Sequence, residues 1–343
     1  MAVTSIADLW VPDVWIPGVT EKMRNLPSIL NSGVLVQTEE MNRLASGAGA
    51  TVNIPFYKDV TDDDDELQVE DAEPTPGKLT SAKQVAPVLN RVKPYSASAL
   101  SAAVSGSDPV GEILSQLGRG RLKRRQKVLI ALLRGAFGTA AGAAINAAAA
   151  LSACRVEAAD ETGADATSEQ LISSSLLIDA LALLGELQED VRDGAMLCHP
   201  DIRAALLEQD ENSFERKSEG AFTIERYKGI PIFVSNALRR AGVTSGFVYD
   251  TYVIARGVVG FGEKPQLGDV IDVASLQYDE SKGKNNATVY DRIRFLMQLN
   301  GMKWIGAPAG QSASNAELQA AANWQLSFQS ADRVGAVCVR TNG

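Results

Sequence analysis

The stretch "DPVGEILSQLGRGRLKRRQKVLIALLRGAF", residues 108–137, decides the fold. Asp108 is a suitable N-cap, and Pro109 stands at the first helical position. Apolar residues then follow at helical spacing, namely Val110, Ile113, Leu114 and Leu117, and again Val128, Leu129, Leu132, Leu133 and Phe137. The pattern predicts one helix of about 43 Å at 1.5 Å per residue. Gly118 and Gly120 each cost about 1 kcal/mol relative to Ala, which weakens the prediction that the helix is continuous.

The middle of this helix is strongly basic. It carries six cations in nine residues, Arg119, Arg121, Lys123, Arg124, Arg125 and Lys127. The opposite charge is concentrated in "TDDDDELQVEDAEPTPGK", residues 61–78. That stretch holds eight carboxylates, Asp62, Asp63, Asp64, Asp65, Glu66, Glu70, Asp71 and Glu73. A solvated charge run, a metal loop and a surface for a basic partner are the three interpretations of the acidic stretch.

The acidic stretch lies between two predicted strands. "ATVNIPFYKDV" before it places Val52, Ile54 and Phe56 on one side, and "TSAKQVAPVLNRV" after it is the returning strand. Pro87 marks the return as an edge strand or a bulge. The two strands predict a long hairpin whose arms reach roughly 40–50 Å at about 3.3 Å per residue. Because an isolated two-stranded ribbon is marginal in water, a ribbon of this length needs a surface to lie on.

The rest of the chain mixes helices and strands. Residues 1–50 have little periodicity apart from a short helix at 38–44, and residues 140–168 predict a helix end followed by a loop. Helices are predicted at 171–187 and after Pro200, and strands at "GAMLC", "GIPIFVSNAL", "SGFVYDTYVIARGVVGFG", "VIDVASLQYD", "ATVYDRIRFLMQLNGMKWIG" and "RVGAVCVRTN". There is no strict βαβ alternation, so the predicted class is α+β.

Composition excludes several classes of protein. The net charge of -9 repels phosphate backbones and argues against a sequence-specific reader of nucleic acid. Three well-separated cysteines give neither a disulfide framework nor a zinc site, and they fit a reducing cytoplasm. The first residues lack a basic segment and are interrupted by Pro12 and Pro17, so no secretion signal is expected. No stretch predicts a membrane span.

Motifs for chemistry are weak. Cys198 next to His199 suggests a thiol nucleophile, but neighbours on a strand point to opposite faces, and a packed thiol is the favoured interpretation. The alternating Asp62, Asp64 and Glu66 lack the glycine and the bidentate glutamate of a calcium loop. "GVVGFG" at 257–262 lacks the spacing of a phosphate loop, so tight turns are expected there. We therefore expect no catalytic residue, no metal site and no cofactor.

Several stretches in succession resemble one family. They are "ADLWVPDVW" with "LNSGVLVQ", the ribbon ending in "KPYSASALSAAVSGSDPVGEILSQLGRGRLKRRQKVLIALLRGAF", "GIPIFVSNAL", "FVYDTYVIARGVVGFG", and "DRIRFLMQLNGMKWIG" with "NWQLSFQSADRVGAVCVRTN". In this order they resemble the major capsid proteins of tailed bacteriophages, which have the Hong-Kong-97-type fold. No single motif is diagnostic, because the family is recognised by the succession of elements. The likeness covers most of the chain.

The resemblance implies five regions. They are an N-terminal arm (1–50), an extended β-hairpin loop (51–95), a peripheral domain with a long spine helix (96–140), an axial domain (141–265), and the return strands of the peripheral domain with the C-terminal segment (266–343). The long helical scaffolding segment with which some members begin is missing, so a separate scaffolding protein is expected. Lys78 and Lys83 lie on the ribbon, but nothing marks an asparagine for the covalent crosslink of some members.

The resemblance also implies a function. The chain would be a non-enzymatic coat protein that self-assembles, as hexamers and pentamers, into the icosahedral head around packaged double-stranded DNA. Portal and decoration proteins are the other implied partners, with assembly in the host cytoplasm, no membrane partner and no sequence-specific contact with DNA. Two alternatives stay open, namely an encapsulin-like nanocompartment shell with enzyme cargo and a hydrolase that uses Cys198.

In such shells the extended loop lies across the neighbouring subunit, which supplies the surface that the ribbon needs. We therefore expect the eight carboxylates at 62–73 to face the six basic residues at 119–127 of an adjacent copy. The alternative is that the basic band keeps the helix soluble. If the pairing is right, replacing Arg124 and Arg125 by Glu should impair assembly and leave the subunit folded.

Overall fold

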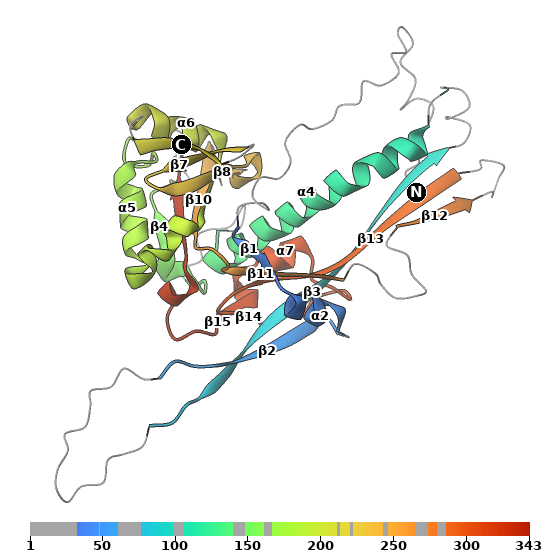
Figure 1. Ribbon diagram of the computed structural model, residues 1–343, viewed down its shortest axis with the longest axis horizontal. Helices are drawn as coiled ribbons and strands as arrows, with labels where there is room; N and C mark the ends of the chain where they lie inside the picture. The colour runs from blue at the N-terminus through green and yellow to red at the C-terminus, as the bar shows by residue number, and fades with distance from the viewer. Residues whose placement is uncertain are drawn as a thin grey trace, which may run out of the picture.

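The structure is a computed structural model, and it describes residues 33–47, 49–60, 77–98, 106, 108–139, 148–160, 167–210, 213–219, 222–242, 246–264, 274–279 and 286–343. Helices and strands are mixed, as the α+β prediction requires. Within these ranges the strands form two eight-stranded sheets. One sheet is long and narrow and continues into the ribbon, and the other lies in a compact body with two helices (Figure 1).

The long sheet is built on two strands, β3 (Ser81–Ser98) and β13 (Asn286–Leu299). They run antiparallel from the pair Asn286 and Ser98 to the pair Leu296 and Val88. Its strand order is β1 (Leu35–Gln37), β11 (Val259–Lys264), β13, β3, β14 (Met302–Trp304) and β15 (Trp324–Leu326), with β12 (Ala274–Asp279) on β13 and β2 (Thr51–Tyr57) on β3. Helix α2 (Glu39–Ser46) contacts β11 and β13.

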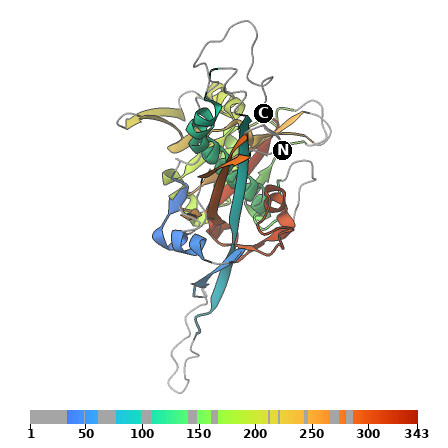
Figure 2. The ribbon, with the colours of Figure 1, turned by 90° about the vertical axis from the view of Figure 1, so that its right-hand side faces the viewer.

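The predicted hairpin is present. β2 pairs antiparallel with β3 from Thr51 opposite Pro87 to Tyr57 opposite Ser81. Pro87 lies where β3 changes partner from β2 to β13, and its missing N–H is tolerated at such a position. The paired part spans seven residues, or about 23 Å, and the outer part of the predicted arms lies outside the described residues. Two perpendicular views show it projecting as a thin extension from the body (Figure 1, Figure 2).

The compact body holds the second sheet. Its order is β4 (Arg155–Glu157), β16 (Ala336–Thr341), β10 (Phe247–Ile254), β5 (Ala195–Cys198), β8 (Ile230–Val234), β7 (Phe222–Tyr227) and β6 (Phe214–Glu219), with β9 (Arg239–Ala241) on β10. Helices α5 (Ser174–Ala182) and α6 (Pro200–Gln209) belong to this body. The predicted helix over 171–187 is wrong in length. It ends at Ala182 because Gly185 adopts a φ of +54° and a 3-10 turn follows.

Helix α4 (Pro109–Phe137) is continuous and links the two sheets. The Asp108 side chain accepts the Gly111 N–H at 2.9 Å, and Gly138 ends the helix with a φ of +70°. Gly118 and Gly120 therefore do not interrupt it. Its last three turns, from Val128 to Phe137, are buried, whereas the N-terminal half is partly exposed.

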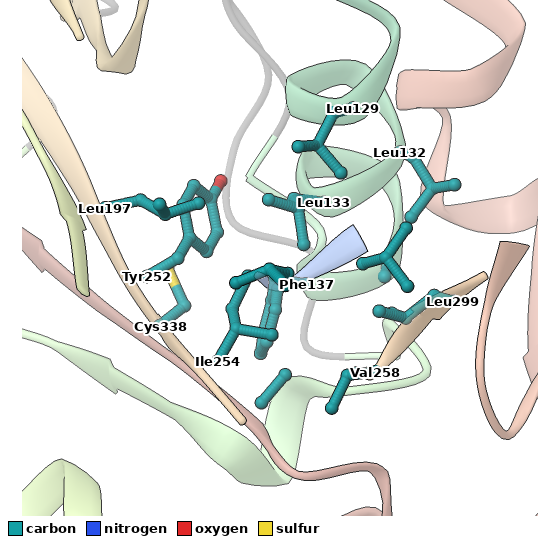
Figure 3. Packing of buried hydrophobic residues seen from close by; sticks show 14 of the residues in the cluster. Leu129, Leu132, Leu133, Phe137, Leu197, Tyr252, Ile254, Val258, Leu299 and Cys338 are labelled. Carbon is teal, nitrogen blue, oxygen red and sulfur yellow. The ribbon is translucent and has the colours of Figure 1, made fainter. Parts of the chain in front are cut away.

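The buried end of α4 organises the main core. Figure 3 shows Leu129, Leu133 and Phe137 of the helix pointing toward Tyr252 and Ile254 of the compact sheet. The Phe137 and Tyr252 rings lie 5.7 Å apart, and Leu299 of the long sheet belongs to the same buried cluster. One apolar core therefore joins both sheets through one helix. Burying side chains of this size contributes about 1.5–3 kcal/mol each.

We expected the glycines of "GVVGFG" to make tight turns, but only one of the three does so. Gly257 does, with a φ of +77° between β10 and β11. Gly260 and Gly262 instead lie within β11, under α2. A Cβ on Gly262 would lie 2.1 Å from the Met41 carbonyl oxygen, so this glycine allows the helix to approach the strand.

Glycines on α4 give the first prediction. A Cβ on Gly135 would lie 2.0 Å from the carbonyl oxygen of Leu318 in α7 (Asn315–Gln319), whereas a Cβ on Gly118 meets nothing within 4 Å. Gly135→Ala should therefore lower the free energy of unfolding by about 1–3 kcal/mol. Gly118→Ala should raise it by up to about 1 kcal/mol, because Ala favours the helix. Urea unfolding of the unassembled chain measures both, and equal effects would contradict the close approach at Gly135.

Candidate assembly interface

The basic band of α4 is largely turned toward its own subunit. Asp291 of β13 has no exposed side-chain surface and lies against two arginines of the helix. The Arg121 Nε donates to Asp291 Oδ1 at 2.7 Å, and Arg124 pairs with Oδ2. Arg124 also donates to the Tyr95 hydroxyl at 3.0 Å. A buried carboxylate is tolerated because both of its oxygens have cationic partners.

A third cation of the band is also used within the subunit. Arg125 pairs with Glu263 of β11, and its guanidinium lies 5.3 Å from the centre of the Phe261 ring. Arg121, Arg124 and Arg125 thus each have an acidic partner in their own chain, and their predicted contact with a neighbouring copy stays a prediction. For the same reason, we expect replacement of Arg124 and Arg125 by Glu to destabilise the subunit itself as well as to affect assembly.

The other three cations of the band are available. Arg119 and Lys127 are exposed and Lys123 is half-buried. Within the described part of the chain, none of the three contacts a carboxylate. The predicted partners Asp62, Asp63, Asp64, Asp65, Glu66, Glu70, Asp71 and Glu73 lie outside the described residues. The pairing between these two sets stays a prediction.

Sequence reasoning missed a pocket beside the band. It lies between α4, β3 and β13 and has a volume of about 170 Å³. Its polar lining comprises Arg91, Lys93, Arg124, Lys127, Asp291 and Asn315. Arg91 and Lys93 are two residues apart on β3, a spacing that places them on one face, but only the register shows that they lie opposite Ile293 and Asp291.

The base of the ribbon is braced by the C-terminal part of the chain. The rings of Phe56 on β2 and Phe328 meet edge to face at 5.4 Å. Arg333 pairs with Asp59 at 2.9 Å. Beyond this brace the ribbon presents large apolar side chains to solvent, since Tyr57 is 75% exposed, Val60 72% and Leu79 58%. A projecting ribbon with exposed apolar side chains fits a contact with another molecule.

The arrangement around Cys198 does not support a nucleophile. Burial raises the pKa of the Cys198 thiol to about 12, so the thiol stays protonated at neutral pH. His199 caps α6 instead, because its Nδ1 accepts the Asp201 N–H at 3.2 Å. The His199 ring packs 5.1 Å from Tyr249, whose hydroxyl donates to Asp201 at 2.8 Å. This pair is a structural element of the compact body.

Other chemistry is sparse in the parts of the chain that are described. No group of three or more His, Cys, Asp or Glu side chains is arranged to hold a metal ion there. Cys154, Cys198 and Cys338 are all free thiols and buried. Among the described helices, none is both long and apolar enough to cross a membrane.

Asp291 gives a second prediction. Arg124→Glu would place a second carboxylate against one that has no exposed surface. We expect the free energy of unfolding to fall by about 3–5 kcal/mol. Arg119→Glu, on the same helix and exposed, is the matched control and should change it by no more than about 0.5 kcal/mol. Urea unfolding that gives the same midpoint for both variants would show that Asp291 does not need its arginines.

His199 gives a prediction about pH. Burial lowers its pKa, and Asp201 opposes this effect only in part. Below about pH 6.5 the unfolded chain therefore binds a proton more readily than the folded chain does, and stability falls as the pH drops further. His199→Asn keeps a capping side chain and removes the proton site. The drop in urea midpoint between pH 7.5 and 5.5 should be smaller in this variant; an unchanged drop would rule out His199 as a source.

Comparison with known proteins agrees with the fold described above. No family model matches the sequence. The major capsid protein of Bacillus phage SPP1 is 25% identical over 329 residues, which cover 95% of this chain and 94% of that protein. The capsid of Ralstonia phage GP4 superposes with a TM-score of 0.62 over 100% of this chain and 98% of its own, at 12% identity. The cyanophage Pam1 capsid gives a TM-score of 0.58 over 100% and 99%, also at 12%. The chain therefore has the Hong-Kong-97-type fold of tailed-bacteriophage capsid proteins, and nearly its whole sequence is similar to one of their major capsid proteins.

Proposed function

We propose that this chain is a major capsid protein that assembles with copies of itself into the head shell of a tailed phage. The similarity in sequence and fold supports the proposal. The observation that carries it is the ribbon of β2 and β3, which leaves the body with Tyr57, Val60 and Leu79 exposed. Among the described residues, the contacts of this extension with its own subunit lie toward its base, at Ala86 and Ile54 and at Phe56 and Asp59.

Assembly follows from the physics of such an extension. Laid on a neighbouring copy, the ribbon would bury apolar side chains and gain contacts for its backbone edges. Each exposed ion pair adds only about 0–1 kcal/mol and is screened by salt. Many weak contacts let a misplaced subunit leave during growth, while a closed shell with all contacts made is stable.

The resemblance extends the proposal to partners. Subunits would form hexamers and pentamers, with a portal protein, a separate scaffolding protein and decoration proteins joining the shell in the host cytoplasm. The net charge of -9 suits a wall around packaged double-stranded DNA, because an acidic surface does not hold phosphates as they move. Contact with DNA would then be free of sequence preference.

Electron microscopy and sedimentation of the purified full-length chain test the proposal, alone and with a scaffolding protein encoded beside it. We expect closed shells or capsomers that sediment far ahead of a 36.5 kDa monomer. A protein that stays a monomer at all concentrations and salt levels would contradict a shell function. For particles from the natural source, genome-length DNA inside supports a phage head, whereas an enclosed enzyme would identify a nanocompartment.

A further inference from the structure

We infer that the pocket between α4, β3 and β13 is a carboxylate-binding site that receives the acidic stretch 62–73 of a second copy of this chain. The pocket is lined by Arg91, Lys93, Arg124, Lys127, Asp291 and Asn315, with apolar walls from Val92, Val128, Ile293 and Phe295. The inference rests on the proposed function for the presence of a neighbouring copy. It replaces the broad expectation of a basic band with one defined pocket.

The pocket has an excess of positive charge. Four of its lining side chains are cations and one, Asp291, is an anion. Asp291 is already matched by Arg121 and Arg124, which leaves Lys93 and Lys127 with no carboxylate partner among the residues that the structure describes. Both lysines are exposed, so a ligand can reach them from solvent.

Arg91 supplies a directional donor. One amino group of its guanidinium donates to the Ala313 carbonyl at 2.5 Å and to Asn315 Oδ1 at 3.1 Å, which fixes the plane of the group. A planar guanidinium suits a carboxylate. At about 170 Å³ the pocket has room for an acidic side chain.

The acidic stretch of the same chain does not reach this pocket. Lys93 lies twelve residues along β3 from Ser81, which is about 40 Å at 3.3 Å per residue. Each carboxylate of 62–73 is at most seven residues from Val60 or Gly77, a reach of about 25 Å when fully extended. The ribbon of β2 and β3 leads away from α4 (Figure 1). A carboxylate from this stretch must therefore come from another copy.

A duplex nucleic acid is the less favoured occupant. The chain as a whole carries a charge of -9, which opposes the approach of a polyanion with one charge per about 1.7 Å. An eight-carboxylate segment held on a neighbouring copy meets the same repulsion, but the subunit contacts of the shell hold it in place. The chain thus provides both the acidic segment and the cationic pocket that complements it.

Direct binding separates this inference from the proposed function. A labelled peptide of residues 61–78 is titrated into the unassembled full-length chain at low salt, beside the same peptide with Asn and Gln in place of Asp and Glu. We expect the acidic peptide alone to bind, and Lys93→Glu with Lys127→Glu to weaken binding by about fivefold or more. The control of equal charge replaces two exposed cations elsewhere, Arg256→Glu with Lys228→Glu, and should leave peptide binding unchanged. An equal loss in the control, no binding, or stronger binding of duplex DNA than of the peptide would overturn the inference.

A charge exchange tests the same contact in particles. Asp63→Lys with Asp64→Lys, and Lys93→Glu with Lys127→Glu, should each lower particle yield, and the four changes together should restore it at the natural net charge of -9. As the control, Asp63→Lys and Asp64→Lys are combined with Arg256→Glu and Lys228→Glu. This variant has the same net charge, and its particle yield should stay low. Rescue cannot come from a misfolded subunit. Lack of rescue, or rescue by the control, would overturn the inference even if the natural chain forms shells.

Discussion

The position of the long helix depends on one buried carboxylate. Asp291 lies on the central strand β13 with no exposed side-chain surface, and it holds Arg121 and Arg124 of α4 against the long sheet. The apolar end of the same helix is fixed separately, by Phe137 and its neighbours between the two sheets. A polar attachment in the middle and an apolar one at the end fix both the position and the rotation of α4. The faces that it presents to solvent, including Arg119 and Lys127, follow from that rotation.

The ribbon, in contrast to α4, has few contacts with the rest of its own subunit. It is continuous with the long sheet through β3, and near Pro87 it still packs on α2 through Ala86 and Ile54. Farther out, its described contacts with the subunit are few, chiefly the brace at Phe328 and Arg333. Its outer apolar side chains are largely exposed, and Tyr57 most of all. A two-stranded element of this kind gains order from a partner surface. The molecule thus joins a rigid frame to an extension that, in the proposed shell, a second copy would complete.

Much of the fold could be predicted from the sequence, because its signals are local. The caps at Asp108 and Gly138, the apolar spacing of α4 and the two arms of the hairpin each depend on neighbouring residues. The interface could not be predicted in the same way. That Arg124 meets Asp291, 167 residues away, depends on strand register, and so does the pocket formed by Arg91 and Lys93. The six cations of the basic band are continuous in sequence, but the twist of the helix points them in different directions. The sequence therefore did not show which of them pair within the subunit and which face solvent. The predicted helix over 171–187 failed because its apolar residues continue past Ala182 into a turn at Gly185.

Hydrogen exchange of the ribbon amides tests the central claim most directly. Backbone amides of residues 56–60 and 77–84 are compared between the unassembled subunit and the assembled particle, with β13 as an internal reference that should be protected in both. The account predicts fast exchange of the ribbon in the lone subunit and strong protection after assembly. Equal protection of the ribbon in the two states would show that one subunit is enough to order it, and would contradict the claim that a second copy supplies its missing surface.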